Sequence, residues 1–206
     1  MRPGLAWLLA AGGAGVLHAL CFAPRNLPWL QLLALAALFA LSTRVATARA
    51  AAGLGFAFGL GWFGVGVSWV YISMHVYGLM PAVLAGAATA AFCAFLALYP
   101  ALALGAAQRL APDARWRLTL ALPATWMLSE WLRGTLLTGF PWLASGYAHT
   151  DGPLAGFAPL IGVYGITLAA ALLAGALALL VLPFALAQVG TSWVRITNYA
   201  ILYVYT

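Results

Sequence analysis

Charged residues are scarce in this chain. Only 6% of its 206 residues are charged, while 66% are hydrophobic; an ordinary soluble domain carries about 25% charged residues. Nine basic and three acidic side chains are too few to cover the surface of a soluble domain of this length. The shortage argues against a soluble enzyme and indicates a membrane protein whose chain crosses the bilayer several times.

Cysteine and the usual catalytic signatures are also rare or absent. Cys21 and Cys93 both fall in apolar runs, and the chain has no CxxC and no clustered histidines, so neither a disulfide framework nor a zinc site is supported. It has no GxSxG, no HExxH, no P-loop and no GxGxxG that follows a strand. We therefore predict no metal, no cofactor and no catalytic residue in this chain.

The apolar residues that dominate the sequence are grouped into runs separated by turn residues. A membrane-spanning helix needs about 20 residues, and this scale predicts an all-α, polytopic bundle of about six transmembrane helices. We place them at residues 4–22, 29–41, 50–73, 81–108, 118–132 and 160–187. Residues 1–187 then form the membrane bundle, and residues 188–206 form a short atypical C-terminal tail. Gly55 and Gly59 make a GxxxG pair, which predicts close helix packing.

The basic residues are all arginine and give a net charge of +6. They lie in short loops, where arginine orients helices, so we expect no nucleic-acid partner. Alternate loops place Arg2, Arg44, Arg49, Arg109, Arg115, Arg117 and Arg195 on one side, and only Arg25 and Arg133 on the other. The positive-inside rule then puts the N-terminus in the cytoplasm and residues 129–160 on the outer side, which in a bacterium is the periplasm.

The outer segment is the most informative part of the sequence. Residues 129–147 read SEWLRGTLLTGFPWLASGY and combine an acid, an arginine and several aromatics. The segment is too apolar for a solvated loop, and irregular backbone at membrane depth needs shielding by helices or a cavity. We expect a re-entrant loop that roofs a cavity between helices.

Two charged residues begin this segment at a helical i, i+3 spacing. Glu130 and Arg133 would share one helix face and pair, which lowers the cost of holding either charge near lipid. One interpretation is a structural ion pair that fixes a helix end. The other is a polar anchor for a phospholipid headgroup or for a loop that admits substrate.

The aromatic and small residues around these charges complete the predicted site. Aromatic side chains at this depth either anchor the protein in the interface or contact substrate. On the second interpretation, the substrate-binding residues are Trp69, Tyr71, Ser73, His75, Glu130, Arg133, Gly139, Phe140, Pro141, Trp142, Gly146 and Tyr147.

Several separated motifs, in order, resemble the membrane part of bacterial apolipoprotein N-acyltransferase. They are FAP with PW at residues 22–29, GWFGVGVSWVYIS at 61–73, SEWLRGTLLTGFPWLASGY at 129–147 and DGPLAGFAPLIGVYGI at 151–166. The resemblance implies a plasma-membrane enzyme of lipoprotein biosynthesis. Its partners would be a phospholipid, as acyl donor, and the N-terminal cysteine of a diacylated lipoprotein precursor, as acceptor.

The same resemblance implies that the catalytic thioester forms on a cysteine of a nitrilase-like domain. We expect that domain to be missing from this chain, because its last residues, TSWVRITNYAILYVYT, do not resemble the family. The chain would then be limited to binding lipid and substrate. Two alternatives remain open at this stage, a small polytopic transporter and a non-catalytic membrane scaffold.

Overall fold

The computed structural model describes residues 4–180, and all regular structure in that range is helical. The expected all-α architecture is therefore confirmed. The end of the sixth predicted run and the tail at 188–206 lie outside the described residues. The helices are α1 (Leu5–Leu20), α2 (Pro28–Ser42), α3 (Ala48–Gly66), α4 (Trp69–Ile72), α5 (Ala82–Leu110), α6 (Ala114–Trp116), α7 (Leu122–Thr135) and a last helical segment, Pro153–Leu180.

Three of these helices are long and apolar enough to cross a membrane, namely Ala48–Gly66, Ala82–Leu110 and Pro153–Leu180. Two further apolar helices, Leu5–Leu20 and Pro28–Ser42, are shorter than a typical span. A single π-helical turn, Arg117–Ala121, joins α6 to α7. The membrane bundle is thus borne out, and the count of six spans stays a prediction.

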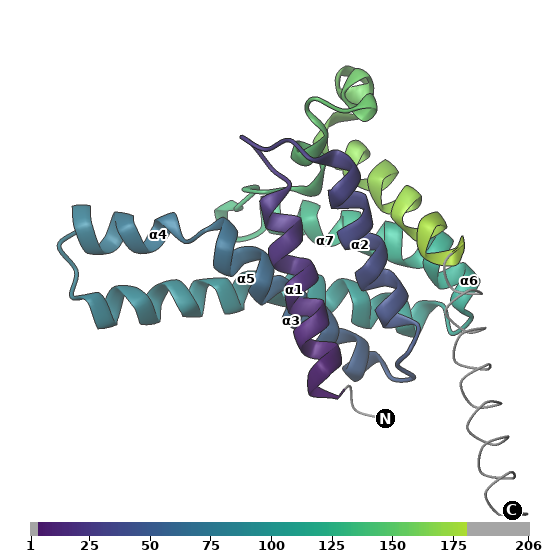
Figure 1. Cartoon of the computed structure of the whole chain (residues 1–206), viewed down its shortest axis with the longest axis horizontal. Coiled ribbons are helices and arrows are strands. Elements are labelled where there is room, and N and C mark those ends of the chain that lie inside the picture. Colours follow the sequence, from purple (N-terminus) through teal and green to yellow (C-terminus); the bar gives the residue numbers. More distant parts are fainter. Residues whose placement is uncertain (1–3, 181–206) are drawn as a thin grey trace, which may run out of the picture.

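Helix α3 lies at the centre of the bundle and packs against α1 and α5 (Figure 1). Glycines allow this approach. A Cβ at Gly55 would overlap the backbone of Pro100 on α5, and a Cβ at Gly61 would overlap the backbone of Gly12 on α1. Small residues permit such backbone contact in lipid, where helices gain little from hydrophobic burial against one another.

The third apolar run differs from its prediction. It was expected to form one helix to residue 73, but α3 ends at Gly66, because Val67 has the non-helical angles φ −118° and ψ 17°. The Ser68 hydroxyl donates back to the carbonyl oxygen of Val65, which competes with the regular helix. The chain continues as α4 and a π-helical turn, Ser73–Tyr77.

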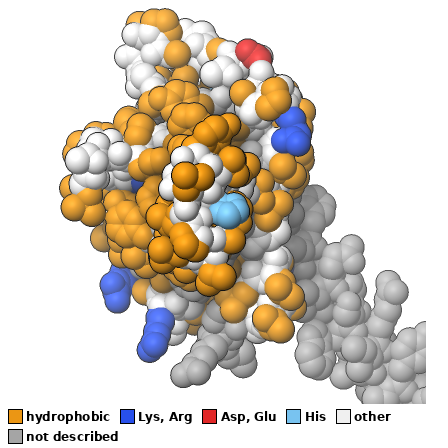
Figure 2. Space-filling model, turned by 90° about the vertical axis from the view of Figure 1, so that its left-hand side faces the viewer, with side chains coloured by type: hydrophobic (Ala, Val, Ile, Leu, Met, Phe, Trp, Pro, Cys, Tyr) orange, Lys and Arg blue, Asp and Glu red, His pale blue; other side chains and the backbone are white. Residues whose placement is uncertain are grey.

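This continuation and the start of α5 form a hairpin arm, residues 69–90, that projects from the bundle (Figure 1). Its side chains are strongly apolar and exposed: Tyr77, Leu79 and Val83 are each more than 80% exposed. Figure 2, which looks toward the arm, shows a mostly hydrophobic face with basic side chains at its margins. Such a face is suited to lipid rather than to water.

The loops separate to the two ends of the bundle. Asn26 donates a hydrogen bond to the Asp151 carboxylate, and Gly152 lies against Pro28, so the 21–27 turn and the 150–152 segment share one end. At another point of the bundle, Gln108 at the end of α5 donates to the carbonyl oxygen of Ala46 at 3.5 Å. Arg25 therefore lies at the end that carries the aromatic loop, whereas Arg44 belongs to the 43–47 loop and Arg109 lies next to it.

Candidate functional site

A buried carboxylate holds the aromatic loop to α7. One oxygen of Glu130, which is 2% exposed, accepts from the Ser145 amide at 2.8 Å and from the Thr167 hydroxyl at 3.1 Å. The other oxygen accepts from the Ser145 hydroxyl at 2.5 Å. Thr167 in turn accepts from the Gly146 amide at 2.9 Å. One side chain thus joins α7, the loop and the last helix.

The Ser145 hydroxyl connects this network to α1. It has a single proton, which it donates to Glu130, so its other contacts must reach it as donors. The indole NH of Trp126 lies 3.3 Å from the hydroxyl oxygen, and Nε2 of His18 lies at the same distance. This accounting places the imidazole proton of His18 on Nε2. The histidine is packed by aromatic edges, among them Trp62 with a centroid distance of 4.5 Å.

Arg133 holds the neighbouring part of the loop. Its guanidinium donates to the carbonyl oxygens of Phe140 and Trp142, both at 2.7 Å. The same group lies 5.4 Å from the ring centroid of Trp62 and 5.2 Å from that of Phe63. These aromatic rings supply a cation–π environment for a side chain that is 2% exposed.

The prediction that Glu130 and Arg133 form an ion pair with each other is wrong. Within the described part of the chain the two side chains make no ion pair; each bonds to the loop instead. The i, i+3 spacing brings them to one helix face, but Glu130 bonds to Ser145 and Thr167, and one terminal nitrogen of Arg133 bonds to the carbonyl oxygens of Phe140 and Trp142. The other two guanidinium nitrogens of Arg133 are buried without a hydrogen-bond partner among the residues that the structure describes. The two residues therefore clamp one segment from two points.

The backbone that leads from α7 into the clamped segment follows an unusual path. Gly139 has φ +80° and ψ 146°, a region that is essentially restricted to glycine, and a Cβ there would overlap the Gly134 carbonyl. The amide of Phe140 then donates to the carbonyl oxygen of Arg133 at 2.7 Å. This turn directs Pro141 and Trp142 away from the bundle core, where Trp142 is 52% exposed.

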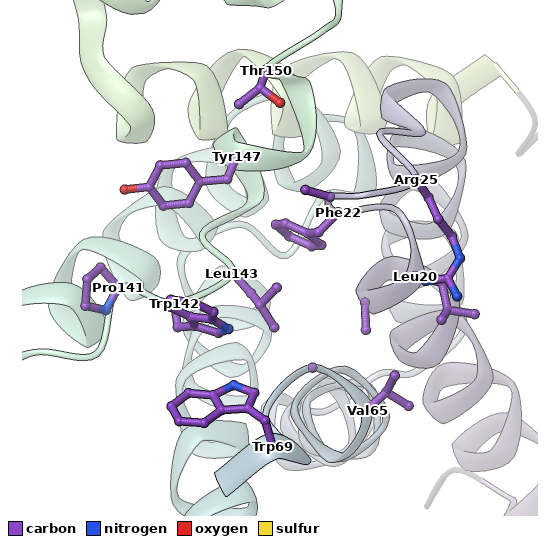
Figure 3. Close-up of a pocket in the computed structure, with 13 residues that line it drawn as sticks. Leu20, Phe22, Arg25, Val65, Trp69, Pro141, Trp142, Leu143, Tyr147 and Thr150 are labelled. Atoms are coloured by element: carbon purple, nitrogen blue, oxygen red, sulfur yellow. The ribbon is translucent and has the colours of Figure 1, made fainter. Parts of the chain in front are cut away.

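Above the clamp lies a cavity of about 620 Å³ between the loop, the end of α1 and the end of α3 (Figure 3). This volume is within the range of about 300–1,000 Å³ of small-molecule sites. Trp142 from the loop and Trp69 from α4 approach each other with a centroid distance of 5.6 Å. The cavity is lined by Ala19, Leu20, Phe22, Ala23, Arg25, Val65, Gly66, Trp69, Pro141, Trp142, Leu143, Tyr147 and Thr150.

The structure divides the predicted site residues into three groups. Trp69, Pro141, Trp142 and Tyr147 line the cavity. Glu130, Arg133, Gly139 and Gly146 shape the loop from below, as described above, and Phe140 packs edge-on against Phe92 of α5 with a centroid distance of 5.1 Å.

The third group, Tyr71, Ser73 and His75, lies on the hairpin arm and does not line the cavity. Nδ1 of His75 lies 2.8 Å from the carbonyl oxygen of Met80, a local contact that closes the arm's turn. The Ser73 carbonyl accepts from the Gly78 amide at 2.9 Å. The spacing of GWFGVGVSWVYIS suggested one continuous helix. The break after Gly66 comes before Trp69, which begins the arm and lines the cavity, whereas Tyr71, Ser73 and His75 lie further along the arm.

Sequence reasoning missed several residues of the site, both in the loop itself and in other elements. Arg25, Val65 and Leu143 line the cavity, and Ser145 and Thr167 complete the Glu130 network. The motifs around FAP and DGP mark the right neighbourhoods, but nothing in the sequence states that these neighbourhoods meet.

A second contact fixes the far end of the loop. Nε2 of His149 lies 3.0 Å from Oε1 of Gln31 on α2. His149 is 1% exposed, and burial lowers its pKa, so the neutral imidazole donates to the amide oxygen. Within residues 4–180 no three His, Cys, Asp or Glu side chains gather in a way that would hold a metal ion.

The fold and site define a polytopic membrane protein with an apolar cavity under a clamped aromatic loop. Residues 14–176 match the family model for the apolipoprotein N-acyltransferase N-terminal domain. The chain therefore belongs to the apolipoprotein N-acyltransferase family, of which it contains the N-terminal domain.

Individual relatives agree. An apolipoprotein N-acyltransferase of Ralstonia nicotianae is 57% identical over 166 residues, which cover 79% of this chain and 32% of the relative. A putative apolipoprotein N-acyltransferase of Bordetella parapertussis is 48% identical over 195 residues, covering 85% and 36% respectively. The Nitrosomonas europaea enzyme is 47% identical over 162 residues, covering 78% and 33%. The chain thus spans about a third of the length of these curated relatives.

Proposed function

We propose that this chain is the lipid-binding membrane part of an apolipoprotein N-acyltransferase. Its cavity receives an acyl chain of a substrate, and the clamped loop holds that substrate at the membrane surface for transfer. The acyl donor is a membrane phospholipid, and the acceptor is a diacylated lipoprotein precursor. The protein lies in the bacterial inner membrane with its N-terminus in the cytoplasm.

The observation that carries this proposal is the composition of the cavity walls. Leu20, Phe22, Val65 and Leu143 line the cavity with hydrocarbon, and the exposed polar residues Tyr147 and Thr150 also line it. An apolar interior with a few polar groups at its edge is the usual form of a site for an amphipathic ligand. The arginine-poor end of the bundle holds this cavity, which supports an outer position.

The clamp explains why the loop suits this role. A substrate-positioning surface must be held within a fraction of an ångström to lower the entropy cost of bringing two reactants together. Glu130 and Arg133 make four hydrogen bonds to residues 140–145, and Thr167 adds a fifth to Glu130. Trp142 and Tyr147 extend from this fixed backbone into the cavity wall, so two lipid substrates would meet a rigid edge.

The transporter alternative depended on Glu130 and Arg133 lining a polar path. Both are 2% exposed and neither lines the cavity; the hydrogen bonds of Arg133 reach the loop, and those of Glu130 reach the loop and Thr167. A scaffold without a lipid site remains the competing hypothesis, and it requires the loop's aromatic side chains to be dispensable.

A chimeric enzyme tests the proposal. Residues 14–176 replace the matching segment of the Ralstonia relative, and lipoprotein acylation is measured in membranes and in cells depleted of their own enzyme. We expect the chimera to be active. In this chimera, Trp142→Ala and Tyr147→Ala should each lower kcat/KM for acylation about tenfold or more, since each substitution removes part of the lipid-contacting wall.

Trp131→Ala is the matched control, because Trp131 is an exposed tryptophan, 45% against 52% for Trp142, that does not line the cavity. The control should leave acylation unchanged at equal protein levels. Full activity of both Trp142→Ala and Tyr147→Ala would support the scaffold and remove this proposal.

A further inference from the structure

One basic residue, Arg25, lies at the cavity and takes no part in holding the aromatic loop. Arg25 belongs to the turn between α1 and α2, and its side chain is exposed and lines the cavity. In Figure 3 it stands across the cavity from Trp142 and Tyr147. Within the described residues it makes no ion pair, and Asp151, the acid nearest to its turn, bonds to Asn26 instead.

The backbone that carries Arg25 is fixed from several directions. Its amide donates to the Phe22 carbonyl at 3.1 Å, and the Leu27 amide donates to the Cys21 carbonyl at 2.9 Å. The hydrogen bond between Asn26 and Asp151 ties the turn to the segment after the aromatic loop. The backbone of Arg25 is therefore held at the cavity edge, within reach of a ligand there.

We infer that Arg25 binds the phosphate of the phospholipid whose acyl chain occupies the cavity. This inference rests on the function proposed above and adds an orientation for the lipid. The guanidinium takes the phosphodiester at the cavity edge, and one chain runs inward past Leu20 and Val65, which line the same cavity.

The charge and polarity around the cavity favour a phospholipid. Guanidinium matches phosphate oxygens in a bidentate geometry and is weakly hydrated, so it binds phosphate at a lipid interface more readily than most side chains. An apolar cavity beside an unpaired cation complements a ligand with one anionic group and a hydrocarbon chain. A free phosphate ion would use the cation and gain nothing from the cavity.

A binding experiment on the whole purified chain tests this orientation. The delipidated protein is titrated with a phosphatidylglycerol and with a diacylglycerol of identical acyl chains, and bound lipid is counted by native mass spectrometry. We expect phosphatidylglycerol to bind about five- to tenfold more tightly, and Arg25→Gln to abolish that difference, because only the phosphate contact is removed. Arg25→Lys should keep part of it.

Two pairs of variants control the result. Arg44→Gln removes an exposed arginine of the 43–47 loop, away from the cavity, and should not change the preference. Val65→Trp fills the cavity from α3 and should weaken both lipids, whereas Leu60→Trp, at a position of equal exposure on the same helix (40% against 39%), should weaken neither.

The possible results distinguish the phosphate site from the acyl cavity. An undiminished preference in Arg25→Gln would overturn the phosphate site while leaving the acyl cavity in place. Competition by excess inorganic phosphate that needs Arg25 but is insensitive to Val65→Trp would assign the site to a free anion and also overturn the inference. If Val65→Trp binds both lipids like the unmodified chain, the cavity itself, and with it the proposed function, is wrong.

Discussion

Glu130 accepts a 2.8 Å hydrogen bond from the backbone amide of Ser145, 15 residues further along the chain. Through this contact, a carboxylate in α7 fixes the irregular loop that forms one wall of the cavity. The Ser145 hydroxyl and Thr167 add two further donors to the same carboxylate.

Replacing Glu130 should show whether its charge or its acceptor atoms matter. In Glu130→Gln the amide oxygen still accepts from the Ser145 amide and Thr167. The new NH₂ donates to the Ser145 hydroxyl, whose own proton turns to Nε2 of His18 in its other tautomer, so we expect a loss of about 1 kcal/mol. Glu130→Leu strands these buried donors and should cost about 2–5 kcal/mol. Thermal unfolding of the detergent-solubilised chain measures both. Equal stability of the leucine variant and the unmodified chain would contradict the clamp.

Removing the guanidinium of Arg133 should open the loop locally. Arg133→Gln cannot reach both carbonyl oxygens at residues 140 and 142, and losing charge-assisted hydrogen bonds costs about 1.5–3 kcal/mol. Since about 1.4 kcal/mol is a factor of ten, we expect about ten- to a hundredfold faster chymotrypsin cleavage within 139–147. Cleavage at other positions should keep its rate, and an unchanged rate in the loop would show that Arg133 does not hold it.

Gly139 should be intolerant of a side chain. Its φ of +80° and the carbonyl of Gly134 leave no place for a methyl group, so Gly139→Ala should lower stability by about 1–3 kcal/mol. Gly156 lies in the same outer segment with no atom near its Cβ position, and Gly156→Ala serves as the control. Unfolding midpoints should fall for the first variant and stay for the second. A similar fall in both would mean that the whole segment resists substitution for another reason.

The glycines of α3 offer a second matched pair. A Cβ at Gly55 would overlap the Pro100 backbone, whereas Gly64 on the same helix has open space. Gly55→Ala should destabilise the bundle by about 1–3 kcal/mol through overpacking. Gly64→Ala should be neutral or stabilise by about 0.5–1 kcal/mol, because alanine favours the helix. Unfolding in denaturing detergent measures the difference, and equal effects would contradict the α3–α5 contact.

Acid should weaken the contact between His149 and Gln31. Because burial lowers the pKa of His149 below about 6.5, the unfolded chain binds the proton more readily, and stability falls as pH drops below that value. We expect a lower unfolding midpoint at pH 5.5 than at pH 7.5, and a smaller difference in His149→Gln, which keeps a hydrogen-bonding side chain at this position. An identical pH response in the two proteins would show that His149 makes no contribution.

Much of the fold could be read from the sequence, and the reasons are local. Runs near 20 apolar residues and the turn residues between them placed the helices to within a few residues, as for α5, expected at 81–108 and observed at Ala82–Leu110. The GxxxG pair correctly indicated close packing of α3, because a glycine lets the backbone of a neighbouring helix approach closely, whichever helix that is. The break after Gly66 was missed because hydropathy does not register a change in backbone angles at Val67.

The candidate site was predicted less evenly. The aromatic loop and its two charged residues were identified from composition, but Glu130 and Arg133 were paired with each other on helical spacing alone. Their true partners are loop atoms at 140–145 and Thr167, whose approach depends on how the last helix packs. Arg25 was treated only as an orienting charge, because its turn meets the loop through a contact 125 positions apart in the chain.

The sequence by itself determined that this is a helical membrane protein of the apolipoprotein N-acyltransferase family, since hydropathy and ordered motifs are properties of the linear chain. Only the tertiary structure decided that Trp69 and Trp142 face one cavity, that Glu130 and Arg133 hold its roof, and that Arg25 stands at its rim. The reason is physical: a buried polar group bonds to whatever donor or acceptor packing brings within about 3 Å, and packing joins segments that the sequence keeps far apart.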